Sequence, residues 1–140
     1  MTRAPLVLAA LSMLAACASV GKRETASLVA AVERFESVDP VAKTGAGDVV
    51  RSAPSSDPEV NDAKASCVDG VDHTLRALAL KAEVEQKVAE LERDAAPATD
   101  PVMQALPAKL DESEALLKQG RAAMKVCDAK VTALRMKYDL

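Results

Sequence analysis

Apolar residues recur every seven positions along residues 103–138 of the chain. One set runs from Met103 to Tyr138, and a second set, offset by three, runs from Leu106 to Leu134. The first set is Met103, Leu110, Leu117, Met124, Val131 and Tyr138. The second set is Leu106, Ser113, Gly120, Cys127 and Leu134, in which Ser113 and Gly120 are two weak positions. Two such sets form the apolar seam of a coiled coil, so this region is predicted to be one long helix with a packing partner.

The same helix-start signal occurs twice in the second half of the chain. Asp57 and Asp100 are N-cap residues, and each is followed by a proline at the first helical position. We expect one helix to run from Asp57 to about Ala95, a turn over residues 96–99, and another helix to reach Tyr138. At 1.5 Å per residue, each helix would be about 55 Å long.

The residues before Asp57 predict a shorter helix followed by a linker. Leu28, Val32 and Phe35 recur at helical spacing, which predicts a helix over residues 23–38 that ends at Asp39-Pro40. Residues 39–56 contain two glycines, two prolines and paired serines, which are typical of a flexible connection.

The first residues of the chain follow the plan of an export signal. Arg3 precedes an apolar stretch over residues 6–13, which has the length of a signal-peptide core and is too short to span a bilayer. Leu14-Ala15-Ala16-Cys17 follows directly. This run resembles the lipobox of bacterial lipoproteins, and the resemblance covers residues 1–17 only.

The resemblance implies that residues 1–16 are removed as a signal peptide and that Cys17 carries a lipid. Residues 17–22 would then form a lipidated tether, and the mature chain would be anchored in the cell envelope. Because Ala18 rather than an aspartate follows the cysteine, the resemblance implies the outer membrane, with the protein facing the periplasm. No family is recognised for the mature part.

The two other cysteines, Cys67 and Cys127, predict a disulfide, because an even pair in a small exported domain usually forms one. Together with His73, the only histidine, they do not complete the four ligands of a metal site. Pro97 lies midway between the two cysteines, so two helices folded back at Pro97 would bring the cysteines level. We therefore expect residues 57–140 to form a disulfide-locked antiparallel helical hairpin, coiled-coil-like in its packing.

The two cysteines alone set how the two helices are aligned, without reference to their apolar residues. In this alignment, small residues nevertheless lie opposite large ones. Gly70 faces Met124, and Ala77 faces Leu117, as close packing requires. Two layers contain polar residues, Thr74 with Gly120 and Lys81 with Ser113.

The helix after Asp57 carries a second apolar stripe that one partner helix does not need. Its members are Val68, Val71, Leu75, Leu78 and Ala82. Either the shorter first helix folds back onto this stripe and makes a three-helix bundle, or the stripe is a docking surface for another protein.

The composition excludes several classes of function. The chain has no Trp, one Tyr and one Phe, which argues against stacking on sugars or nucleobases. Lys and Arg number 18 against 21 Asp and Glu, so nothing indicates a nucleic-acid partner. No nucleophile, paired carboxylates or phosphate loop stands in a catalytic context, and we expect no enzyme activity, no cofactor and no metal.

The sequence therefore favours a non-catalytic helical module that acts structurally or by binding an envelope protein. The alternative is a periplasmic carrier that holds an apolar ligand between its helices, with Met103 and Met124 lining an adaptable groove. The sequence leaves the oligomeric state open, because partner chains could satisfy the same heptads.

Overall fold

In a computed structural model of the chain, the backbone is described for residues 5–140 and the side chains for residues 20–140. The described part contains four helices and no strand, and these helices make up 84% of the 140-residue chain. They are α1 (Pro5–Ser37), α2 (Lys43–Ser52), α3 (Pro58–Arg93) and α4 (Pro101–Tyr138). The prediction of an all-helical fold is confirmed.

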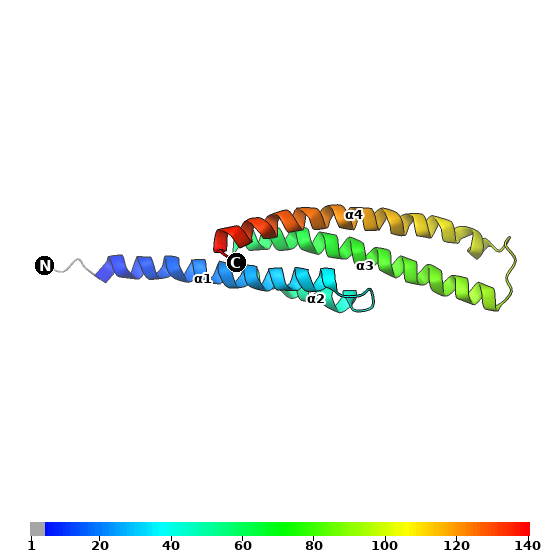
Figure 1. Ribbon diagram of the computed structural model, residues 1–140, viewed down its shortest axis with the longest axis horizontal. Coiled ribbons are helices and arrows are strands. Elements are labelled where there is room, and N and C mark those ends of the chain that lie inside the picture. Colours follow the sequence, from blue (N-terminus) through cyan, green and yellow to red (C-terminus); the bar gives the residue numbers. More distant parts are fainter. Residues whose placement is uncertain (1–4) are drawn as a thin grey trace.

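Helices α3 and α4 lie side by side and run in opposite directions (Figure 1). The Asp57 carboxylate accepts hydrogen bonds from the amides of Glu59 and Val60, and the Asp100 carboxylate accepts one from Val102. These side chains satisfy amides that have no partner inside the helix, which explains why both helices begin where the sequence predicts. Between them, Ala95 has a φ of 50°, a left-handed conformation that ends the helical path.

The predicted disulfide joins Cys67 of α3 to Cys127 of α4, and neither side chain is exposed. One helical turn further on, the backbone of Gly70 lies so close to Met124 that a Cβ atom on Gly70 would stand 3.0 Å from the amide nitrogen of Met124. A Cβ atom on Gly120 would likewise stand 3.2 Å from the amide nitrogen of Thr74. The two glycines therefore permit the close approach of α3 and α4.

The polar layer predicted around Ser113 is different in the structure. Ser113 is buried and its hydroxyl donates a 2.9 Å hydrogen bond to the carbonyl of Ala77, whereas Lys81 is exposed and pairs with Glu85. The small hydroxyl can be satisfied by a backbone carbonyl of the neighbouring helix. The long cationic side chain of Lys81 reaches solvent instead.

The two apolar sets of α4 are buried to different degrees. All members of the set from Leu106 to Leu134 are buried, while Leu110 in the other set is 41% exposed and Leu117 is half-buried. Along the arm, where α4 packs on α3, the members of this second row are half-buried or exposed. The second row becomes buried only at Val131, where α1 also packs against α4.

A single apolar core occupies one end of the molecule. Leu28, Val32 and Phe35 of α1 pack with Val50 of α2 and with the parts of α3 and α4 around the disulfide. This core reaches Leu75 along α3 and Met124 along α4. We call residues 20–75 and 124–140 the base, and the remainder of α3 and α4, residues 76–123, the arm (Figure 1).

The sequence prediction of a flexible linker over residues 39–56 is wrong, because residues 43–52 form α2 and pack in the base. A Cβ atom on Gly47 would lie 2.8 Å from Val71 and 2.9 Å from Leu75, so this glycine lets α2 pack directly on α3. Lys43 donates hydrogen bonds to the carbonyls of Phe35 and Glu36 at the end of α1, which fixes the connection between the two helices. Small residues that resemble a linker in sequence are here a packing surface.

The first helix is longer than predicted. Residues 17–22, expected to be a tether, belong to α1, and Gly21 is already buried. The side chain of Cys17, the predicted lipidation site, lies outside the described residues, as do the side chains of the predicted signal peptide, residues 1–16. α1 and α2 cover the first half of the extra stripe on α3 around Val71, and Leu78 and Ala82 lie beyond them.

Candidate functional site: the arm and the junction of α1 with α3

The arm carries accessible apolar side chains along α4, beside its contact with α3. Val84 is buried between α3 and α4, but Leu110 beside it is 41% exposed, and Val102 near the turn is 47% exposed. Shallow hollows open on the arm, and two of them include Leu110 or Val102 in their lining. One is lined by Lys81, Val84, Glu85, Val88, Ala89, Glu92 and Leu110, and the other by Glu83, Lys87, Pro101, Val102, Ala105, Leu106 and Lys109. Both hollows combine an apolar floor with a charged rim, which is typical of a protein-binding surface.

Ion pairs across the arm align its two helices. Lys109 pairs with Glu83, and Arg76 pairs with Glu112 at 3.2 Å. These pairs are exposed and add little to stability, but they favour one alignment of α3 and α4. Acidic residues outnumber basic ones between Glu83 and Glu114, so the outer half of the arm has a negative charge.

The apolar-ligand hypothesis concerns Met103 and Met124, and the structure places these residues far apart. Met124 lies at the edge of the base and fills the space beside Gly70, while Met103 lies near the α3–α4 turn and is half-buried. The hollows described above are open to solvent rather than enclosed. The two methionines therefore do not line a common groove in this structure.

At the opposite end of the molecule, a buried carboxylate joins α1 to the start of α3. Glu24 is 7% exposed, and its carboxylate accepts hydrogen bonds from the amides of Ser56 and Asp57, each at 2.9 Å, and from the Ser56 hydroxyl. The Asp57 amide and the Ser56 hydroxyl stabilise the charged form and hold the pKa of Glu24 below its ordinary value, although burial opposes them. Glu24 thus fixes α1 to the N-terminus of α3.

The end of α4 meets the same junction. The Tyr138 hydroxyl donates a 3.3 Å hydrogen bond to the Asp57 carboxylate. A Cβ atom on Gly21 would collide with the Tyr138 ring, so the only tyrosine of the chain lies directly on the backbone of α1. Three helices are therefore held together within a few residues of Cys17.

Replacing Glu24 by Gln is expected to lower the free energy of unfolding by about 2 kcal/mol near neutral pH, because hydrogen bonds to a charged group contribute about 1.5–3 kcal/mol. The folded state lowers the pKa from 4.5, so this contribution is complete above that value and is lost as the pH falls through the lower, folded-state pKa. Denaturant titrations near neutral pH and at about pH 3 measure the free energy of unfolding of both proteins. The difference between the wild type and the variant should be smaller in acid.

Glu33→Gln is the matched control for this variant, because Glu33 is an exposed glutamate of the same helix whose pairing with Arg135 adds little stability. We expect its unfolding to resemble that of the wild type at both pH values. An equal loss from Glu33→Gln and Glu24→Gln would contradict the role of the junction.

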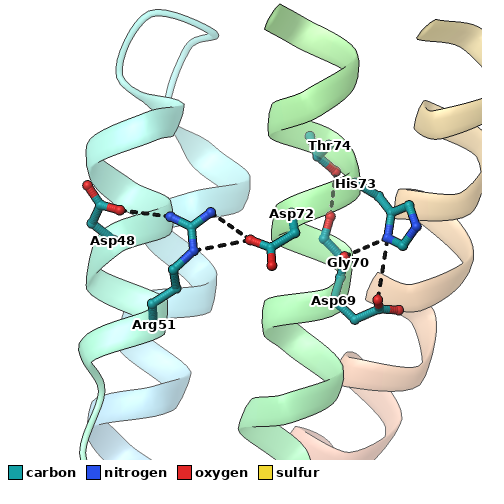
Figure 2. A network of polar contacts seen from close by, with 7 residues as sticks. All are labelled: Asp48, Arg51, Asp69, Gly70, Asp72, His73 and Thr74. Atoms are coloured by element: carbon teal, nitrogen blue, oxygen red, sulfur yellow. Dashed lines mark hydrogen bonds and ion pairs between the residues drawn. The ribbon is translucent and has the colours of Figure 1, made fainter. Parts of the chain in front are cut away.

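A polar network on the surface of the base joins α2 to α3 (Figure 2). Arg51 donates to Asp48 at 2.7 Å and to Asp72 at 2.6 Å, and these carboxylates raise the pKa of Arg51. On the other side of α3 in Figure 2, His73 contacts the carbonyl of Asp69 at 2.8 Å and its carboxylate at 3.5 Å. His73 therefore interacts with its own helix, and the network holds α2 in place.

Two properties of the described residues bear on the site. No group of three or more histidine, cysteine or carboxylate side chains in the described part of the chain could hold a metal ion. Among the residues searched, no helix is long and apolar enough to cross a membrane.

Glu24 is the site residue that the sequence analysis missed, and a signal for it exists. Glu24 precedes Leu28 by four residues and therefore lies on the buried face of α1, together with Val32 and Phe35. A single charged residue on an apolar stripe needs a buried partner. The partner itself, the start of α3, could be identified only from the three-dimensional arrangement.

Comparison of the chain with protein-family models, with curated protein sequences and with solved structures finds no match.

Proposed function

We propose that this chain is a bacterial lipoprotein whose mature part, beginning at Cys17, is a non-catalytic helical module of the cell envelope. The observation that carries the proposal is the run Leu14-Ala15-Ala16-Cys17 directly after an apolar stretch of signal-peptide length. The Cys67–Cys127 disulfide supports export, because such bonds persist in oxidising compartments. The residue after Cys17, Ala18, favours the outer membrane with the protein facing the periplasm.

In this proposal, α3 and α4 act as a disulfide-locked, coiled-coil-like hairpin, and the arm binds an envelope protein. The apolar floors and charged rims of the two hollows support a protein partner. The base, with its buried core and its junction at Glu24, serves as the rigid support. The negative charge of the outer arm favours a partner with a basic surface. Parallel pairing with a second anchored copy is disfavoured, because it would bring two arms of like charge together.

Fractionation of cells that produce the wild type or a Cys17→Ser variant tests the anchor. We expect the wild type in the membrane fraction with a lipid mass on Cys17, and the variant mostly outside that fraction, because two or more acyl chains are needed for stable anchoring. A Cys67→Ala, Cys127→Ala double variant is the control and should stay in the membrane fraction. Equal membrane association of the wild type and Cys17→Ser would refute the anchor.

Photo-crosslinking in cells tests the interaction role. A photoreactive amino acid at Val102 or Leu110 samples the arm, and the same group at Val41, which is 93% exposed in the base, is the matched control. We expect both arm positions to give the same adduct and Val41 to give none. If the arm positions give no adduct, or the same adducts as Val41, the arm is not the binding surface.

A further inference from the structure

The distance between Cys17 and the folded base is very short. Only Ala18, Ser19 and Val20 separate Cys17 from Gly21, which is buried. Even a fully extended chain spans no more than about 3.6 Å per residue, so Cys17 lies within about 14 Å of Gly21. A lipid on Cys17 therefore holds this end of the base next to the bilayer, without a long tether that would let the domain turn freely.

The same end of the base carries exposed side chains suited to a membrane surface. Met136 is 74% exposed and Leu140 is 44% exposed, and both belong to the end of the chain that packs beside Gly21. Lys22 and Arg23 are exposed one and two residues after Gly21. Apolar side chains enter the headgroup region, and long cationic side chains reach lipid phosphates. Asp139 lies there too, so the contact depends on these individual side chains and not on a net positive charge.

The α3–α4 turn lies at the far end of the α3–α4 pair from the C-terminus (Figure 1). α3 has 36 residues, which correspond to about 54 Å at 1.5 Å per residue. The connection between α1 and α2, where Val41 lies, is at an intermediate level, because the 16 helical steps from Gly21 to the end of α1 correspond to about 24 Å. The end of the base at Gly21, the α1–α2 connection and the α3–α4 turn therefore lie at three known positions along the long axis.

From these observations we propose that the end of the base formed by Gly21, Met136, Tyr138 and Leu140 lies on the headgroup region of the bilayer that holds the lipid of Cys17. The arm then points away from the membrane and presents the α3–α4 turn about 54 Å from that end. This inference rests on the proposed lipidation of Cys17. It adds a defined orientation and a membrane-contacting surface to the anchor.

Single tryptophan variants of the full lipoprotein test the orientation, because the wild type has no tryptophan. Met136→Trp, Val41→Trp and Ala98→Trp place the probe at the three levels, and all three positions are exposed. Each variant is reconstituted into phosphatidylcholine–phosphatidylglycerol vesicles with or without a short-range quencher on the lipid headgroup. We expect severalfold quenching for Met136→Trp only, with Val41→Trp and Ala98→Trp unaffected.

Two measurements separate failure of the orientation from failure of the anchor. Vesicle co-sedimentation and the mass of the Cys17 peptide are recorded for every sample. Absence of the lipid overturns the anchor and, with it, the orientation. If the protein is lipidated and sediments, equal quenching of Ala98→Trp and Met136→Trp means that the molecule lies flat on the membrane. No quenching of Met136→Trp means that this end of the base does not touch the membrane, and either result overturns the orientation alone.

Discussion

Removing the Cys67–Cys127 disulfide by the double substitution Cys67→Ala, Cys127→Ala is expected to lower the free energy of unfolding by about 4 kcal/mol. The bond joins residues separated by 60 positions, and the lost crosslink frees a long loop in the unfolded chain. Native proteins of this size are typically stable by about 5–15 kcal/mol, so the effect is a large share of the total. Urea denaturation of the detergent-solubilised protein, followed by helical circular dichroism, measures it.

Reduced wild type is the matched control for this double variant, since it keeps both sulfur atoms in the buried site and lacks only the crosslink. We expect the reduced protein to lose nearly as much stability as the double variant. A loss below about 1 kcal/mol in both proteins would mean that the crosslink does not constrain the unfolded chain as the loop model requires.

The second large effect is expected from Leu28→Ala, which should lower the free energy of unfolding by about 2–5 kcal/mol. Leu28 is 0% exposed and lies in the core where α1 meets the other helices. Its truncation removes apolar contacts and leaves a cavity that the neighbouring side chains fill only in part. The same urea titration applies.

Val41→Ala is the control for the packing of α1, because Val41 is 93% exposed. Exposed substitutions of this kind usually change stability by less than about 0.5 kcal/mol. If Leu28→Ala were as mild as Val41→Ala, α1 would not be part of the folded base, and the base could not be held close to Cys17 by α1.

The starts of the two long helices could be predicted from sequence because the signals are local. An N-cap aspartate followed by proline acts through the amides of its own first turn, so Asp57 and Asp100 mark the starts of α3 and α4 without information from the rest of the fold. The two cysteines then provided one long-range constraint. With the register fixed at Cys67 and Cys127, the close approach of Gly70 to Met124 followed.

The α2 helix could not be predicted because the residues that pack around a glycine decide whether it loosens the chain or allows a close helix contact. Gly45 has no neighbouring atom within 4 Å of an added Cβ, whereas Gly47 is in tight contact with Val71 and Leu75. The sequence gives both residues the same local flexibility, and only packing on α3 makes Gly47 necessary and the segment helical. The Glu24 junction was missed for a related reason, since Ser56 and Asp57 follow it by more than thirty residues.

The arm shows how a repeated pattern can predict a helix but not its burial. The heptads of α4 predicted two buried rows, and only the row from Leu106 to Leu134 is buried throughout. The other row is covered in the base by α1 and remains accessible in the arm around Leu110. Apolar residues beyond those that the fold covers are the physical basis for proposing that the arm binds a partner.

Peptide mapping of the protein purified from membranes, under non-reducing conditions, is the most direct test of the central claim. We expect a mature chain that begins at Cys17 with a diacylglycerol mass on that residue, and a Cys67–Cys127 crosslink within one chain. A chain that keeps residues 1–16 without lipid would contradict the anchor, and free thiols or a crosslink between two chains would contradict the disulfide-locked module.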